Sequence, residues 1–347
     1  GVPVESANVN ITFVHESGAN FSCRPVLELG TGNYSCELNT SGMPARWYNI
    51  SMEVSKQPWY IDNSTLRSKP STGSSPYGAV FIETEPLLEV IKVNTSTYDG
   101  DDGNIGGYSE TFNFSVRVTD EDGDPVRVYI YYRKWDPVAE NWGEWQPLLA
   151  TSTSSGTAGV NYAECSSCDH TLVWLAKDDF TCADMGVYQF NFTAKDSTAY
   201  PAGYEAESQV YEVQTSPRNF TIEEDDVQVL YYAGNNEFVW RNGTASVDLV
   251  MYVFDIDAQA NLSVGEARGD VWITKDHNKF VKVATLDLEG TPGETAYFTY
   301  SLDPDCTYDV GLQKWFMGTA PAAGTTCYKL VNSSVYNVSI GGWLNVS

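Results

Sequence analysis

Aspartates at alternate positions are the residues of this chain whose type and spacing best fit a chemical task. The acidic turn DEDGDP places Asp120, Asp122 and Asp124 two residues apart, with Gly123 among them. Hard cations such as Ca²⁺ collect carboxylate oxygens in this way. The turn lacks the full twelve-residue EF-hand loop and its final Glu, and Asp and Gly also favour turns for backbone reasons. The favoured interpretation is a plain strand-connecting turn, and a Ca²⁺ site at Asp120, Asp122 and Asp124 is the alternative.

Three further acidic segments are weaker Ca²⁺ candidates. They are residues 99–104 (DGDDGN), the pair Asp255 and Asp257, and residues 223–226 (EEDD). The chain has 46 acidic and 20 basic residues and a formal charge of -26, so closely spaced carboxylates also arise as a solvated, self-repelling surface. That surface is the alternative for each segment.

A cysteine cluster offers a second kind of chemistry. Cys165, Cys168, Cys182 and His170 supply three thiols and one imidazole, which are ligands that zinc accepts. An exported chain favours instead a disulfide from Cys182 to Cys165 or Cys168. We predict the disulfide, with one of the three cysteines left over.

The remaining cysteines predict two more disulfide regions. Cys23 and Cys36 flank a short hairpin-like segment, and Cys306 and Cys327 lie about twenty residues apart. This spacing predicts about one disulfide per domain.

Catalytic motifs are missing from the sequence. None of His15, His170 and His277 lies in a motif that pairs a nucleophile with a base, and with 46 acids a carboxylate pair carries little information. We expect no enzyme and no cofactor other than Ca²⁺.

N-glycosylation acceptors are far more frequent than chance predicts. Fifteen of 22 Asn residues stand in Asn-X-Ser/Thr, where composition predicts about four. Many have an apolar middle residue, which strand alternation produces when that residue points into a core and the Asn points outward. We therefore predict N-linked glycans on sheet faces. The predicted sites are Asn10, Asn20, Asn33, Asn39, Asn49, Asn63, Asn94, Asn113, Asn191, Asn219, Asn242, Asn261, Asn332, Asn337 and Asn345.

These sites must be positioned by strands, and the stretch from Glu110 to Arg133 shows how. Apolar residues alternate from Phe112 to Val118 and again from Val126 to Tyr132, on either side of the acidic turn. The pattern predicts a hairpin or strand pair with one buried face. Asn113 would then point outward from the middle of its strand.

A tyrosine corner is predicted further along the chain. Asp184, Gly186 and Tyr188 follow the D-x-G-x-Y pattern, in which the Tyr hydroxyl bonds back to the backbone at the entry of a core strand. Tyr308 in the last third gives only a weak echo of it.

The stretches FNFSVRVTDEDGDPVRVYIYY and DMGVYQFNFTAKDS together resemble the immunoglobulin-like and polycystic-kidney-disease-type β-sandwich modules that occur in tandem in archaeal surface proteins. The resemblance covers about 130 residues and departs from the antibody pattern in lacking the cross-sheet cysteine pair, so the core would rest on aromatics such as Trp174. It implies an archaeal secreted protein, such as a subunit of an extracellular filament or an S-layer-like coat.

We predict an all-β chain of tandem immunoglobulin-like β-sandwich domains at residues 1–85, 86–215 and 216–347. The first has about five strands, fewer than a sandwich needs. Either a partner's strand completes it, or strands in its loop-rich part escape the pattern.

Charge and hydropathy limit the partners. A charge of -26 opposes binding to nucleic acid and to anionic membranes, and no run of eighteen apolar residues predicts a membrane span. The start Gly1-Val-Pro-Val resembles a processed N-terminus. We predict a secreted structural subunit that assembles with copies of itself, with strand donation as one route. The alternative is a cell-surface adhesin or carbohydrate-binding stalk.

Overall fold

The computed structural model of the chain describes residues 5–57, 60–66, 80–95, 103–123, 125–149, 151–152, 161–165, 168–176, 180–196, 212–241, 245–321 and 327–342. In these ranges nearly all of the regular secondary structure is β-strand, and the one helical segment is the 3-10 turn η1 (Cys182–Asp184). Within the same ranges, no helix is long and apolar enough to cross a membrane. The all-β prediction is confirmed.

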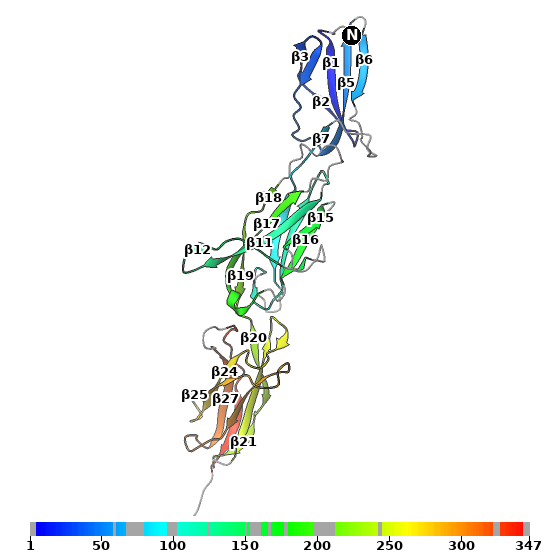
Figure 1. Cartoon of the computed structure of the whole chain (residues 1–347). Helices are drawn as coiled ribbons and strands as arrows, with labels where there is room; N and C mark the ends of the chain where they lie inside the picture. Colours follow the sequence, from blue (N-terminus) through cyan, green and yellow to red (C-terminus); the bar gives the residue numbers. More distant parts are fainter. Residues whose placement is uncertain are drawn as a thin grey trace, which may run out of the picture.

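The strands form three units that follow one another along an extended row (Figure 1). Strands β1 to β7 form the first unit, β8 to β19 the second and β20 to β28 the third. Each unit has its own cluster of buried apolar residues, as tandem domains require.

The first unit is a five-stranded sheet beside a separate hairpin. The sheet has the order β2-β1-β5-β6, with β7 also on β5, and the hairpin is β3-β4. Its strands are β1 (Asn8–His15), β2 (Asn20–Cys23), β3 (Val26–Gly30), β4 (Asn33–Cys36), β5 (Arg46–Lys56), β6 (Tyr60–Leu66) and β7 (Val80–Ile82). Among the described residues of this unit, the buried core cluster contains Phe13, Cys23, Met43 and Tyr48.

The second unit contains a four-stranded sheet, β14-β16-β10-β8, and an eight-stranded sheet built around β12-β11-β17-β19-β9. Its strands begin with β8 (Leu87–Asn94), β9 (Ile105–Gly107), β10 (Phe112–Thr119), β11 (Val126–Asp136), β12 (Asn141–Trp142), β13 (Gln146–Pro147) and β14 (Thr151–Ser152). They continue with β15 (Tyr162–Cys165), β16 (Asp169–Ala176), β17 (Gly186–Asp196), β18 (Glu212–Gln214) and β19 (Arg218–Glu223).

The second unit confirms the predicted alternation but not the predicted hairpin. Phe112, Phe114, Val116 and Val118 are fully buried. However, β10 pairs with β16 and β8, whereas β11 pairs with β17 and its neighbours. The two strands therefore lie in opposite sheets, and the acidic turn crosses between the sheets instead of closing a hairpin.

Strand β19 lies in a different unit from the one we predicted. We placed residues 216–347 in the last domain, but Arg218–Glu223 pairs antiparallel with β17 and parallel with β9 in the second unit. Alternation alone does not reveal which sheet a strand joins.

The third unit packs the sheet β20-β22-β23, with β26 on β22, against the sheet β21-β28-β27-β24-β25. Its strands are β20 (Val227–Ala233), β21 (Glu237–Trp240), β22 (Val247–Asp255), β23 (Ala260–Asn261), β24 (Arg268–Thr274), β25 (Phe280–Asp287), β26 (Tyr297–Leu302), β27 (Gly311–Ala320) and β28 (Tyr336–Gly341).

A buried corner recurs at the third residue of one core strand in each unit. The Tyr188 hydroxyl donates to the carbonyl of Asp184, which confirms the predicted tyrosine corner. The Tyr48 hydroxyl donates to Pro44 O at 2.6 Å, and Gln313 Nε2 donates to Asp309 O at 2.8 Å. Tyr308, which we took as the echo in the last unit, is not the corner residue.

The first residue of each corner strand has a positive φ, at 86° for Arg46, 146° for Gly186 and 121° for Gly311. The backbone therefore makes the same bend three times, although different side chains close it. This repetition is the clearest structural sign that the three units share one plan.

The strands nearest the two ends of the chain are interior strands of their own sheets. β1 pairs with β2 and β5, and β28 pairs with β21 and β27. Donating either strand to another subunit would require it to leave its own sheet.

Candidate functional site

The connection between the second and third units consists of three residues. Strand β19 ends at Glu223 and β20 begins at Val227, so Glu224, Asp225 and Asp226 form the whole link. Asp225 N donates to Cys327 O at 3.0 Å, and Lys329 N donates to Asp225 O at 3.0 Å. The backbone of the link is thus hydrogen-bonded to the third unit.

Three buried carboxylates meet at this link. Asp225, Asp255 and Asp257 each place a carboxylate oxygen within 4.8 Å of the other two, and their exposed fractions are 0%, 3% and 5%. In the part of the chain that the structure describes, this is the one acidic or metal-ligating group of such compactness. We call these three residues the junction cluster.

The junction cluster joins two of the weaker sequence candidates. Asp255 closes β22 and Asp257 follows it, while Asp225 comes from the segment 223–226. The two segments lie about thirty residues apart in the sequence, and only the fold brings them together. In the candidate segment 99–104, residues 99–102 lie outside the described residues.

Backbone amides hold two of the carboxylates in place. Asp255 Oδ1 accepts from the N–H groups of Asp257 at 2.9 Å and Ala258 at 2.8 Å. Asp257 Oδ2 accepts from Asp226 N at 2.7 Å. These bonds fix the carboxylate positions before any ligand is considered.

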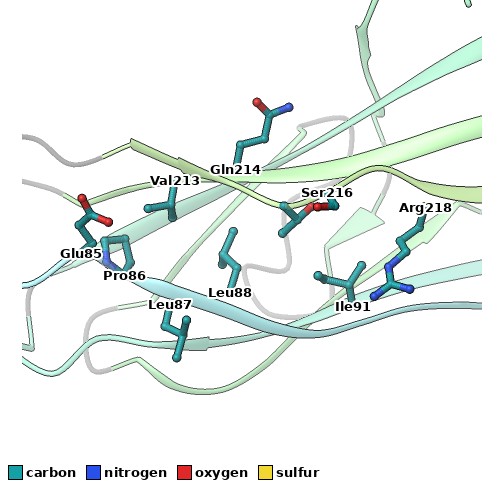
Figure 2. A pocket seen from close by; sticks show the side chains of 10 residues that line it. Glu85, Pro86, Leu87, Leu88, Ile91, Val213, Gln214, Ser216 and Arg218 are labelled. Atoms are coloured by element: carbon teal, nitrogen blue, oxygen red, sulfur yellow. The ribbon is translucent and has the colours of Figure 1, made fainter.

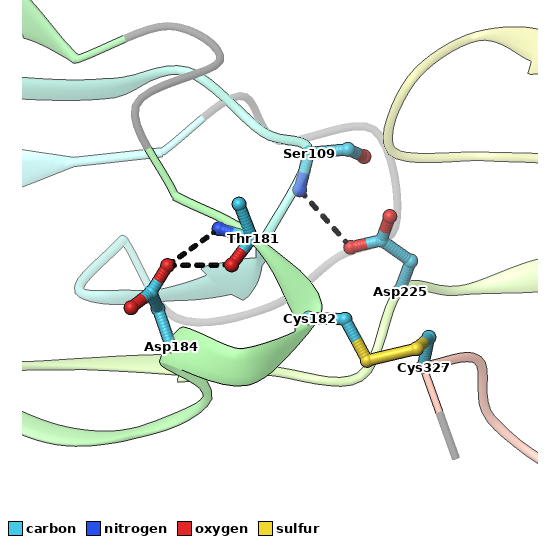
Figure 3. Close-up of a disulfide and its surroundings, with 6 residues drawn as sticks. All are labelled: Ser109, Thr181, Cys182, Asp184, Asp225 and Cys327. Carbon is cyan, nitrogen blue, oxygen red and sulfur yellow. Dashed lines mark hydrogen bonds between the residues drawn. A yellow bond between two sulfur atoms is a disulfide. The ribbon is translucent and has the colours of Figure 1, made fainter. Parts of the chain in front are cut away.

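The second unit reaches the cluster through the turn that follows β9. Ser109 N donates to Asp225 Oδ1 at 3.2 Å (Figure 3). A Cβ added at Gly107 would lie 2.2 Å from Asp257 Oδ2 and 2.3 Å from Asp225 Oδ1. Glycine is therefore required for the carboxylates to approach this strand so closely.

Burial and mutual repulsion act on the cluster. Burial, with the neighbouring Asp255 charge, raises the pKa of Asp225 to about 7, although Ser109 opposes this by hydrogen bonding. Burial also raises the pKa of Asp255, to which the Glu266 charge adds. A nearby positive charge would lower the pKa of a buried carboxylate. The raised pKa values therefore indicate that burial and like charges dominate around Asp225 and Asp255.

Other titratable groups surround the cluster. Burial raises the pKa of Tyr108 to about 12 and also raises the pKa of Tyr328, and the two rings lie with centroids 6.2 Å apart. The Lys329 ammonium lies 2.8 Å from both Glu223 and Asp226. Burial lowers the pKa of Lys329, but its hydrogen bonds with these two carboxylates outweigh that effect and raise it.

A disulfide ties the two units together beside the cluster. Cys182 in η1 is bonded to Cys327, 145 residues further along the chain (Figure 3). Thr181 N and Oγ1 donate to Asp184 Oδ2 at 2.8 and 2.7 Å, and Asp184 O accepts the corner bond from Tyr188. The motif that we read as a corner therefore also positions Cys182.

The disulfide pairing differs from the one we predicted, except at one pair. Cys23 and Cys36 are bonded, as predicted. Cys182 bonds neither Cys165 nor Cys168, which bond each other, and Cys306 is exposed and free instead of pairing with Cys327. Sequence spacing favours short loops, whereas the fold brings Cys182 and Cys327 together across two units. With these thiols bonded to each other, the zinc alternative is not supported.

The acidic turn with the candidate Ca²⁺ site lies at the other junction. Asp122 Oδ2 accepts from Thr84 N at 2.8 Å, Asp122 O accepts from Arg46 Nη1 at 2.7 Å, and Ala45 N donates to Glu121 Oε1 at 3.2 Å. Asp124 lies outside the described residues. The turn connects the first and second units, and a Ca²⁺ site at Asp120, Asp122 and Asp124 stays the alternative interpretation.

Two predicted glycosylation sites have no room for a sugar. Asn49 is 7% exposed and Asn191 is 1% exposed, because their strands are covered on both faces. Alternation identifies the face opposite the core but not whether that face is itself covered. Exposed acceptors are Asn20, Asn33, Asn39, Asn94, Asn219, Asn261 and Asn332, and Asn10, Asn113 and Asn337 are half-buried. Nothing is described for the side chains of Asn63, Asn242 and Asn345.

A groove opens between the edge strands β8 and β18 of the second unit. It has a volume of about 470 Å³. Figure 2 shows Leu88, Ile91 and Val213 between the strands, with Arg218 at one end. Val90, at φ 51°, lies in a bulge of β8, and such bulges turn an edge away from further strand pairing.

No protein-family model matches the sequence, and comparison with curated proteins gives no match. Among solved structures, a tetra-tandem repeat from the extending region of a large adhesion protein is 12% identical, with a TM-score of 0.36, and the match covers 98% of this chain and 68% of that one. The D1–D4 ectodomain fragment of ICAM-5 is 10% identical, with a TM-score of 0.36 and coverage of 97% and 69%. Because both TM-scores are below 0.5, the fold class rests on the strand order and the buried cores described above.

Proposed function

We propose that the protein is a non-catalytic, glycosylated subunit of an extracellular filament or cell-surface coat, which assembles end to end with copies of itself. The observation that carries the proposal is a row of three β units whose two ends both expose apolar side chains. The disulfides fit an oxidising compartment, and the number of glycosylation acceptors supports export.

One apolar patch lies on the third unit, at the end of the row near β21 (Figure 1). Phe238 is 52% exposed, Trp240 41% and Leu312 52%. Phe238 and Leu312 lie on either side of Ser339 in adjacent strands, and a Cβ at Gly341 would lie 2.5 Å from both Phe238 and Trp240. The three side chains therefore form one continuous face.

The opposite end of the row offers a second apolar surface. In the β3-β4 hairpin of the first unit, Leu27 is 56% exposed and Leu29 is 68% exposed. Contact between two different surfaces of the same chain is heterologous, and such contacts generate open filaments when they do not close into a ring. Glycans on sheet faces would disfavour lateral packing and leave these ends available.

Electron microscopy with matched variants tests the proposal. The glycosylated chain is expected to form filaments or sheets in negative stain as its concentration rises. Trp240→Glu should abolish assembly, whereas Val138→Glu should not, because Val138 is 91% exposed at a hairpin tip on the side of the row. A chain that stays monomeric at all concentrations, or equal assembly by both variants, would refute the end-to-end contact.

The groove between β8 and β18 favours adhesion as the second candidate function. Its apolar floor and terminal Arg218 could receive part of a carbohydrate or peptide. Saturable binding of the monomer on a glycan array, lost in Arg218→Ala and Leu88→Lys, would support this function. A platform on which sugars stack against Trp142 and Trp145 is a weaker candidate for the binding site. The Arg133 guanidinium already lies 4.4 Å from the Trp145 ring centroid and 5.3 Å from that of Trp142.

A further inference from the structure

We propose that Asp225, Asp255 and Asp257 bind one divalent cation of the Ca²⁺ class, and that this ion fixes the third unit against the second. The inference concerns the subunit itself and does not depend on its assembly.

The first observation is an orphaned oxygen. Asp225 is 0% exposed, and none of the described residues donates a hydrogen bond to its Oδ2. The carboxylate faces those of Asp255 and Asp257, whose oxygens lie within 4.8 Å. A buried ionised oxygen without a donor is strongly disfavoured, and a cation within the cluster supplies the missing interaction.

The second observation is the space kept at Gly107. The added Cβ would overlap oxygens of both Asp225 and Asp257, so any other residue would push these carboxylates apart. The backbone of a strand in the second unit thus approaches a cluster carried by the link and the third unit. An ion held there would be enclosed by segments from both sides of the junction.

The donor chemistry selects the class of cation. Each of the three side chains offers a carboxylate oxygen to the shared centre. Such hard oxygen donors suit Ca²⁺, which tolerates irregular geometry and completes its six to eight ligands with carbonyl oxygens and water. Zinc prefers imidazole and thiolate, and the nearest cysteines, Cys182 and Cys327, are bonded to each other. Extracellular Ca²⁺ modules commonly have weak affinities, with Kd of about 10⁻⁴–10⁻³ M.

The competing possibility is a proton instead of a metal ion. A neutral Asp225 could donate to Asp255 and relieve the repulsion without any ligand. The two possibilities differ in their dependence on Ca²⁺ and pH, and in the effect of removing one charge.

Titration of the full chain with CaCl₂ in a calorimeter, at pH 7, tests the proposal. We expect heat from a single saturable site per chain. At a Ca²⁺ concentration of one hundred times Kd, the folding equilibrium of the third unit should shift by about a hundred-fold.

Asp225→Asn is the decisive variant because Asn preserves the shape and the bond from Ser109 N. In chelator at pH 8 it should be more stable than the natural chain, since one repelling charge is gone, and it should gain nothing from Ca²⁺. Asp276→Asn is the matched control, because Asp276 is an exposed turn residue that bonds its own Asn278 and Lys279 amides. This control should retain the full Ca²⁺ response.

Gly107→Ala gives an independent test through the space beside the cluster. It should weaken Ca²⁺ binding at least ten-fold, whereas Gly143→Ala should not, because a Cβ at Gly143 would meet only Lys134 O, at 3.4 Å. The proposal is overturned if Ca²⁺ binds no more tightly than Na⁺ at equal ionic strength, or if Asp225→Asn responds to Ca²⁺ like the natural chain.

Discussion

The two junctions of this molecule use different physics to connect similar units. The junction between the first and second units is held by hydrogen bonds from Thr84 N and Arg46 Nη1 to Asp122 and from Ala45 N to Glu121, and the Arg46 side chain is 45% exposed. The junction between the second and third units has a disulfide, a three-residue link and three buried carboxylates.

The difference predicts where the row bends. Hydrogen bonds between partly exposed groups each contribute only about 0.5–1.5 kcal/mol, so the first junction resists bending only weakly. A covalent bond beside buried charge leaves the second junction few alternative arrangements, but makes it sensitive to reductant, pH and cations. We expect the first unit to move relative to a stiffer pair formed by the second and third.

Removing the interunit disulfide should have the largest effect. The Cys182→Ser, Cys327→Ser double variant loses a cross-link that spans 145 residues, which corresponds to about 5 kcal/mol of unfolding free energy in the chain-entropy model. Denaturant unfolding measures the loss. Cys306→Ser is the control, because Cys306 is free and exposed, and its stability should change by less than about 0.5 kcal/mol.

The pH dependence of the second junction should come next. In chelator, the stability of the third unit should fall by about 2–4 kcal/mol as the pH rises from about 4 to about 7, because the pKa of Asp225 is about 7 in the folded chain and about 3.9 when unfolded. Below pH 4 both states hold the proton, so the Asp225 carboxylate then causes no loss of stability. Thermal unfolding of the third unit at pH 5 and pH 8 measures the fall, and a flat profile, or an equal fall in Asp225→Asn, would contradict it.

At the first junction, Asp122→Ala should cost about 1–2 kcal/mol, because the partly buried Thr84 N–H loses its acceptor. Small-angle scattering should show greater bending between the first and second units, with the second junction unchanged. If the variant scatters like the natural chain, Asp122 does not hold this junction.

Arg46→Ala should have the smallest effect, about 1 kcal/mol, because its ion pair with Glu16 is exposed and its hydrogen bond to Asp122 O comes from a side chain that is 45% exposed. Arg46→Gly should cost less still, since Gly adopts the φ of 86° at this position without strain. Both variants lose the contacts of the Arg46 side chain, so the difference between their free energies of unfolding measures the backbone strain at this position. Equal losses would mean that this strain is negligible.

Local patterns predicted what local physics controls. Period-two alternation identified the buried face of β10, and the D-x-G-x-Y pattern identified the bond from Tyr188 to Asp184. The same bend in the third unit escaped notice because Gln313 replaces the tyrosine. Gln313 also accepts from Thr274 Oγ1 at 2.8 Å, a contact between strands that no local pattern encodes.

The candidate site was predicted only in fragments. Asp255 and Asp257 stood out through their spacing, and Asp225 through its acidic neighbours, but the third contributor, Gly107, carried no signal. Aspartates usually lie on the surface, but the fold buries these three together. Asn191 is the opposite case: the alternation pattern predicted an exposed glycosylation acceptor, but its side chain is buried in the structure.

The sequence by itself determined the all-β class, the buried faces of the main strands and an excess of negative charge, because side-chain alternation and composition act over a few residues. The tertiary structure alone decided that β10 and β11 face each other from opposite sheets, that Cys182 meets Cys327, and that the two acidic segments converge beside Gly107. These are contacts between residues far apart in the chain, and they form only when the packing of whole units brings them within a few ångströms.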